Sequence, residues 1–159
     1  MPFDAQKYLT YLDQERRRAV IVHAEPEKGA AMTQFARKLC VRSGGKYIDL
    51  LDWFLQHQEV SAEIDSFSPE KFRVFLIEQS KGFGLLLVDR ADFVLDTWRR
   101  TERRDFFNMI TDQWDGYKDG TRAKLLIALQ TSQEIEALSI LDSQGQSRVL
   151  RLSDFNDIL

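Results

Sequence analysis

The sequence has few of the residues that cross-link or break a chain. It contains one cysteine, so an internal disulfide cannot form, and Cys40 falls in a helix-like stretch, which is typical of a small buried side chain in a reducing compartment. Only 3 prolines and 8 glycines occur in 159 residues, and no segment is of low complexity. These absences exclude a disulfide scaffold, a fibrous chain and a largely disordered one.

An excess of charge of either sign is also missing. The 22 basic residues against 25 acidic ones give a net charge of −3, so no general attraction to nucleic acid or to an anionic membrane is expected. No apolar run approaches the ~18 residues of a membrane span. The first residues, MPFDA, lack the basic segment and apolar core of a secretion signal, so we expect a cytoplasmic location and no membrane partner.

What the chain does contain is enough apolar material, 43% of its residues, for one domain over 1–159. We expect residues 1–18 to form an N-terminal helix that ends in the arginines at 16–18, where the helix dipole favours cations. Five apolar runs predict buried strands, at 19–23, 46–50, 85–88, 125–129 and 148–152.

Helical patterns alternate with these strands, among them one that opens at Pro69 and one from about Thr101 to Trp114. The run at 85–88 is so uniformly apolar that we expect it to be the central strand. A turn is expected at 115–120. Because parallel strands are joined by right-handed crossovers, the pattern predicts an α/β fold, a three-layer α-β-α arrangement around a mainly parallel five-stranded sheet.

The segment after the first strand has the layout of a phosphate-binding loop but not its residues. Laid on the pattern G-x-x-x-x-G-K-[ST], its positions read Ala24, Gly29, Ala30 and Ala31. The lysine that would reach the β- and γ-phosphates and the hydroxyl that would bind Mg²⁺ are therefore both replaced by alanine. The sequence thus predicts a nucleotide scaffold without its chemistry.

Nearby residues offer only partial substitutes. Lys28 precedes Gly29 instead of following it, and Thr33 lies two residues beyond the expected hydroxyl. Glu25 and Glu27 place negative charge where a triphosphate would sit, and like charges repel strongly at short range in a partly dry site.

Together these features resemble the P-loop ATPase superfamily, in its AAA+ or STAND-like branch, over residues 19–152. The strand at 85–88 followed by Asp89 looks like a Walker B motif, and 125–129 followed by Thr131 looks like a sensor strand. The resemblance implies the sheet order 5-1-4-3-2, with Asp89 and Thr131 facing the loop. If a nucleotide binds, it implies these cofactor-binding residues: Lys28, Gly29, Asp89 and Thr131.

The same resemblance argues against catalysis. Arg90 occupies the position where a catalytic glutamate usually follows the Walker B aspartate. Losing the lysine, the hydroxyl and this carboxylate together removes the groups that stabilise charge and orient water in phosphoryl transfer. In size and motif order the chain is also similar to small P-loop proteins of bacterial anti-phage defence, including the BrxF component of type 3 BREX, although it departs from their glycine-lysine-threonine core.

A basic stretch at 98–105 is the main candidate for contact with a partner. It offers Trp98, Arg99, Arg100, Arg103 and Arg104 to an acidic protein or a phosphate backbone. The alternative is a solvated helix face whose arginines pair with neighbouring carboxylates, with the aromatic side chains packed on the sheet.

No residue pattern predicts a catalytic or metal site of another kind. Asp89, Asp92 and Asp96 would need to converge to hold a metal, and strand-end or helix-capping roles are the alternative. His23 and His57 are far apart and lack zinc-ligand spacing. We expect neither a metal site nor catalytic residues.

Three functions remain open. The first is a non-catalytic accessory subunit that binds a larger protein, in a bacterial defence or DNA-processing complex. The second is a nucleotide-dependent regulator or weak ATPase, with ATP or ADP and Mg²⁺ as cofactor, that a partner subunit completes. The third is a nucleic-acid-binding module that uses the arginines at 99–104.

Overall fold

A parallel five-stranded sheet forms the centre of the computed structural model, which describes residues 4–114 and 122–156. The strand order is β2-β3-β4-β1-β5, and every pairing is parallel. The predicted fold class and the predicted order 5-1-4-3-2 are therefore confirmed. The strands are β1 (Ala19–Ala24), β2 (Lys46–Asp49), β3 (Leu85–Asp89), β4 (Lys124–Gln130) and β5 (Val149–Arg151).

One detail of the sheet differs from the expectation. The strand β3 is buried along its whole length, as its composition indicated, but it is not the central strand. The middle position belongs to β4, which pairs with β3 on one side and with β1 on the other. Both strands are covered on two faces, so an apolar run alone does not distinguish them.

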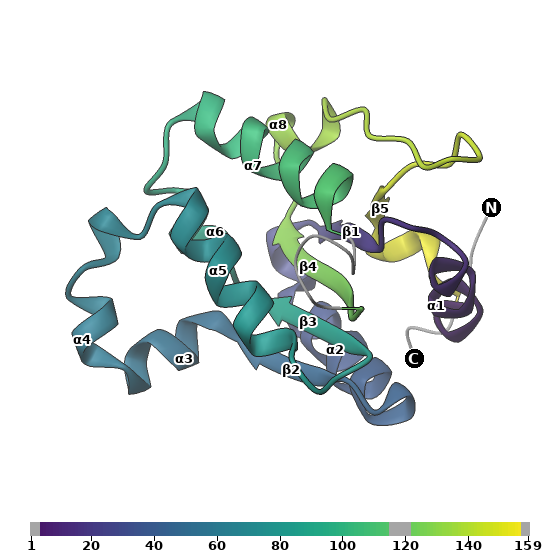
Figure 1. Cartoon of the computed structure of the whole chain (residues 1–159), viewed down its shortest axis with the longest axis horizontal. Helices are drawn as coiled ribbons and strands as arrows, with labels where there is room; N and C mark the ends of the chain where they lie inside the picture. Colours follow the sequence, from purple (N-terminus) through teal and green to yellow (C-terminus); the bar gives the residue numbers. More distant parts are fainter. Residues whose placement is uncertain (1–3, 115–121, 157–159) are drawn as a thin grey trace.

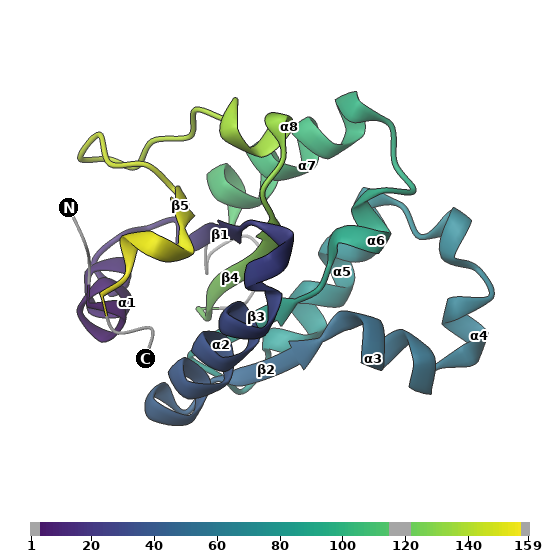
Figure 2. The ribbon, with the colours of Figure 1, turned by 180° about the vertical axis from the view of Figure 1, so that it is seen from behind.

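Helices cover both faces of the sheet, as Figures 1 and 2 show from opposite sides. The apolar side chains of α1 and α2 form a core with Val20 and Val22 of β1, while those of α5 and α7 form a second core with Ile21. The segments α3 and α4 extend beyond the sheet at the left of Figure 1. The helical elements are α1 (Ala5–Asp13), η1 (Pro26–Lys28), α2 (Gly29–Ser43), α3 (Leu50–Gln56), α4 (Gln58–Ser61), η2 (Ile64–Ser66), α5 (Pro69–Ser80), α6 (Asp92–Leu95), α7 (Arg100–Gln113), α8 (Gln133–Glu136) and η3 (Leu152–Asp154).

Local chemistry sets several of these boundaries. The helix α2 ends at Gly44, whose φ of 71° is a left-handed conformation that suits glycine. The helix α5 opens with Pro69 in its first turn, after Ser68, whose hydroxyl accepts a hydrogen bond from the Lys71 amide. The turn expected at 115–120 lies outside the described residues.

The helix α1 is shorter than predicted. It ends at Asp13, and Arg18, which was expected to belong to it, folds back from beyond its end. The Arg18 guanidinium donates to the carbonyl oxygens of Asp13 at 3.0 Å and of Glu15 at 2.9 Å. A cation therefore does satisfy carbonyls that the helix end leaves free, but from a separate segment. The expectation of a helix through residue 18 was wrong because Glu15 is drawn into the interior.

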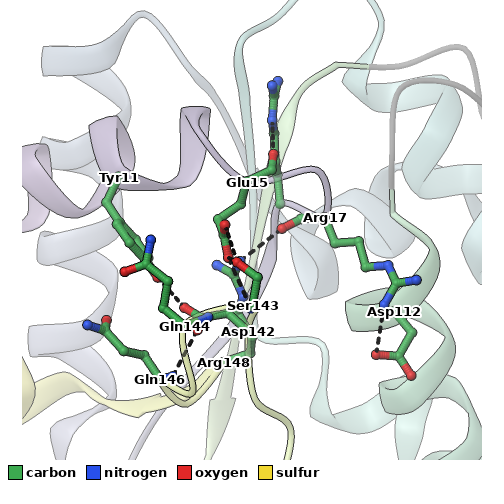
Figure 3. Close-up of polar contacts among 10 residues, drawn as sticks. Tyr11, Glu15, Arg17, Asp112, Asp142, Ser143, Gln144, Gln146 and Arg148 are labelled. Atoms are coloured by element: carbon green, nitrogen blue, oxygen red, sulfur yellow. Dashed lines mark hydrogen bonds and ion pairs between the residues drawn. The ribbon is translucent and has the colours of Figure 1, made fainter.

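The side chain of Glu15 forms a buried ion pair with Arg148, which holds the C-terminal part of the chain to the end of α1 (Figure 3). Glu15 is 8% exposed and Arg148 3%, and their closest nitrogen and oxygen atoms are 2.9 Å apart. The Ser143 hydroxyl donates to the same carboxylate at 2.7 Å, and Arg148 also donates to the Arg17 carbonyl. Arg148 directly precedes β5, so this network fixes β5 beside β1.

We expect Arg148→Met to lower the free energy of unfolding by about 3–5 kcal/mol, because it leaves the Glu15 carboxylate buried without its cation. Urea denaturation at neutral pH measures the change. The control is Arg17→Met, since Arg17 pairs with Asp112 at 4.0 Å and both side chains are more than half exposed. Arg17→Met should lower the free energy of unfolding by less than about 1 kcal/mol. If the two substitutions lower the free energy of unfolding equally, the buried ion pair contributes no more to stability than the exposed one.

Candidate functional site

The segment after β1 is a short helix rather than an open loop. The 3₁₀ turn η1 starts two residues after Ala24 and runs directly into α2. The Lys28 amide donates to the Glu25 carbonyl at 2.8 Å, and the Gly29 amide donates to the Pro26 carbonyl. Pro26 has no N–H to offer. The amides of Lys28 and Gly29 are therefore used internally, and position 26 has no amide to direct at a phosphate.

The backbone angles of this segment agree with its hydrogen bonds. Gly29 is right-handed, with φ −56° and ψ −42°. Among the residues that the structure describes, positive φ occurs only at Gly44, Gly82, Gly145 and Arg90. An anion-binding nest of amides alternates right- and left-handed residues, so Gly29 acts as an ordinary helical residue.

The carboxylate of Asp89, at the end of β3, is held by three donors of the protein. Its Oδ2 atom accepts from the Thr33 hydroxyl at 2.7 Å and from the Tyr47 hydroxyl at 2.8 Å, while Oδ1 accepts from the Arg90 amide at 2.9 Å. Asp89 is only 3% exposed. Burial, followed by the hydrogen bond to Asp89, raises the pKa of Tyr47 to about 12, so its hydroxyl keeps its proton.

A second carboxylate at this edge is neutralised by Arg90. Asp49, the last residue of β2, lies opposite Asp89 in the strand register. Its two oxygens accept from Nε of Arg90, at 3.0 Å, and from Nη2. Arg90 adopts φ 56°, a left-handed conformation that costs a non-glycine residue about 1–2 kcal/mol. The paired guanidinium thus stands where a working ATPase would have a water-orienting carboxylate.

These residues line a cleft of about 560 Å³ between the start of α2 and the ends of β3 and β4. Its walls combine Arg37 and Arg90 with the carboxylates of Glu25, Asp49 and Asp89. The Arg37 guanidinium lies 5.2 Å from the centre of the Tyr47 ring, within cation–π range. Charges of both signs therefore face the cleft.

The four predicted cofactor-binding residues do not converge. Gly29 and Asp89 line the cleft just described, but Lys28 lines a separate one beside His23. Thr131 lines a third cleft, and its hydroxyl lies 2.8 Å from Nδ1 of His23. The structure places Lys28 just ahead of α2, and it places Thr131 beside the end of β1, where its amide donates to the Ala24 carbonyl at 2.8 Å. The assignment of these four residues to a nucleotide stays a prediction.

The neighbourhood of His23 was not anticipated from the sequence. His23 is buried on β1, and Arg151 on the adjacent β5 approaches it. Burial, together with the charge of Arg151, lowers the pKa of His23. The histidine therefore serves as a neutral hydrogen-bonding partner of Thr131 at neutral pH.

Of the acidic residues after β3, Asp92 caps the end of β4 and Asp96 is exposed, while the short helix α6 has no side-chain cap. Asp92 accepts the Gln130 amide at 2.9 Å at the end of β4, and burial raises the pKa of Asp92. Within residues 4–114 and 122–156, no three His, Cys, Asp or Glu side chains are arranged to hold a metal ion.

Two of the residues predicted to contact a partner are engaged by other parts of the chain. Trp98 is 7% exposed, packs against Phe72 and Phe106, and donates its indole N–H to the Phe67 carbonyl. Its prediction as an exposed contact was wrong, because the turn before α7 directs it into the core. Arg103 is largely covered and forms a two-point ion pair with Glu134.

The other three arginines of the stretch are exposed. Arg99 pairs with Glu102 at the start of α7, and Arg100 lies 3.9 Å from Glu134. Arg104 forms no ion pair with any residue that the structure describes. Of the five predicted contact residues, these three remain available at the surface.

We expect Tyr47→Phe to lower the free energy of unfolding by about 1–2 kcal/mol, because Asp89 loses one hydrogen bond while the ring remains. Urea denaturation measures the loss, and millimolar MgCl₂ should not reverse it. If Mg²⁺ restores the stability, the carboxylate is a metal ligand and not a group held by the chain's own hydroxyls.

A pH dependence should follow from His23. Since its pKa is lower in the folded state than the ~6.5 of an unfolded chain, the unfolded state binds more protons between these two values. The free energy of unfolding should therefore rise with pH up to about 6.5 and fall on acidification through the folded pKa. His23→Gln should flatten the slope in urea denaturation series between about pH 5 and 7. If the slope is the same in His23→Gln, groups other than His23 cause the pH dependence of the unfolding free energy.

Comparison of the chain with protein-family models, with curated proteins and with solved structures gives no match. In the described part of the chain, no helix has the length and apolar character to cross a membrane. The structure is therefore classified by its fold alone, as an α/β protein with a parallel sheet in the P-loop-like strand order.

Proposed function

We propose that the chain is a non-catalytic, P-loop-like subunit that binds a protein partner, within a bacterial defence or DNA-processing assembly. The observation that carries the proposal is the state of Asp89. Its carboxylate, the only retained element of a Mg²⁺ site, already accepts hydrogen bonds from Thr33, Tyr47 and the Arg90 amide. Binding a metal there would require breaking this arrangement.

The absence of catalytic groups supports the same proposal. Ala30 and Ala31 supply neither cation nor hydroxyl, and Arg90 is paired with Asp49. In phosphoryl transfer such groups position the nucleotide and stabilise the transition-state charge. A core of buried apolar side chains covers each face of the sheet without them. A scaffold that lacks reaction chemistry is suited to recognition.

A nucleotide-binding regulator is the second candidate, and one observation favours it. The cleft of about 560 Å³ beside Gly29 and Asp89 has room for a ligand, and Arg37 and Arg90 could meet phosphate groups. In that case a partner subunit would complete the site for ATP or ADP with Mg²⁺. Glu25 and Asp49 on the same walls oppose an anion unless their own cations stay in place.

Calorimetric titration with MgATP and MgADP separates the two candidates. The proposed function predicts no heat of binding at millimolar nucleotide and no ATP turnover, because the Lys28 and Gly29 amides and the Asp89 carboxylate already have partners within the chain. Binding without turnover would favour the regulator. Turnover that disappears with Asp89→Asn would contradict the proposal and establish an active ATPase.

A further inference from the structure

We propose that the groove between α7 and α8 binds an acidic segment of a protein partner, in which carboxylates flank an apolar side chain. The inference rests on the proposed function and names the surface and the chemistry of its partner. In both Figure 1 and Figure 2 the two helices lie side by side at one end of the molecule. The ion pair between Arg103 of α7 and Glu134 of α8 joins them directly.

The floor of this groove is apolar. The groove encloses about 230 Å³, and Phe107 and Leu138 lie at its base, with the small residues Thr101 and Ala137 beside them. Phe107 belongs to the core that also contains Phe106, so the floor is rigid. An adjoining cleft of about 440 Å³ shares Phe107 with it and extends the surface along α8. The groove therefore offers an enclosed site for an apolar side chain.

The rim of the groove carries uncompensated positive charge. Glu134 is its one acidic residue, and both Glu134 oxygens already bind the Arg103 guanidinium, at 2.5 and 2.7 Å. The hydrogen bonds from Arg103 lower the pKa of Glu134, so it remains charged and paired. Arg100 is 77% exposed and only 3.9 Å from that shared carboxylate, while Arg104 has no ion pair among the described residues. Arg100 and Arg104 thus remain to meet carboxylates of a partner.

Arginines around an apolar pocket favour a peptide over a nucleic acid. Arginine and buried aromatic residues are enriched at the energetic centres of protein interfaces. A phosphate backbone would instead require a broad positive surface. An apolar floor between two cations gives nothing to a phosphate chain, whereas it suits an apolar side chain that carboxylates flank. Charge complementarity therefore selects an acidic protein segment.

Selection from a phage-displayed library of random short peptides on the immobilised full chain tests the proposal. Enriched peptides should carry Asp or Glu on both sides of Leu, Ile, Met or Phe. The variant R100E/R104E should reduce their affinity about tenfold or more, because it replaces attraction with repulsion at the rim. The control K71E/K81E makes the same change of net charge at Lys71 of α5 and at Lys81 just after it, and should leave the affinity unchanged. Both arginines are exposed, and glutamates in the first turns of a helix are favourable, so the variant should fold.

Fluorescence anisotropy with the enriched peptide then supplies the decisive comparisons. A version with Gln for every Glu should bind about tenfold more weakly. If R100E/R104E binds the enriched peptides with the same affinity as the unmodified chain, the groove assignment is overturned, but the proposed protein-binding function stays in place. A selection that enriches no peptide would overturn the groove assignment. If calorimetry also finds nucleotide binding, that outcome would end the proposed function as well. If single-stranded or duplex DNA binds the chain at low salt and this binding is lost in R100E/R104E, the ligand of the groove is a nucleic acid and not a peptide.

Discussion

The buried carboxylate of Asp89 constrains the geometry of the whole sheet edge. A carboxylate that is almost completely removed from water must be met by donors, because an unpaired buried charge is strongly destabilising. Here the donors come from different elements: Thr33 from α2, Tyr47 from β2 and the backbone amide of Arg90. Satisfying Asp89 therefore fixes α2 and β2 relative to β3.

The same logic explains why the segment after β1 is closed. The amides of Lys28 and Gly29 bond to carbonyls within the turn, because backbone donors gain by being paired. Proline fixes the start of that turn and gives up its own donor. Arg90 shows the converse: it keeps a left-handed backbone at the strand end, at some energetic cost, and its guanidinium neutralises Asp49.

The sequence predicts what depends on local composition and periodicity. Uniform apolar runs identify the strands, Gly44 identifies the end of α2, and Pro69 identifies the start of α5. It does not predict contacts between distant residues: the end of α1 is decided by Arg148, far along the chain from Glu15. Which arginine of α7 becomes structural is likewise decided by Glu134 on another helix. One signal for the site was available, since β2 and β3 both end in aspartate and parallel register brings these residues together.

The groove and the closed nucleotide cleft belong to the same edge of the sheet. Asp92 and Gln130 line both the cleft beside Asp89 and the one that adjoins the groove, and the Gln130 amide donates to Asp92 between them. Open α/β sheets bind their ligands at the carboxyl ends of the strands because crossover connections leave the loops there free to diverge. Two contacts set the position of α7 relative to this edge. Trp98, just before the helix, packs in the core and donates to the Phe67 carbonyl, and Arg103 pairs with Glu134 of α8. A partner seated between α7 and α8 would therefore lie at the carboxyl edge of the sheet, next to the cleft that Asp89 lines.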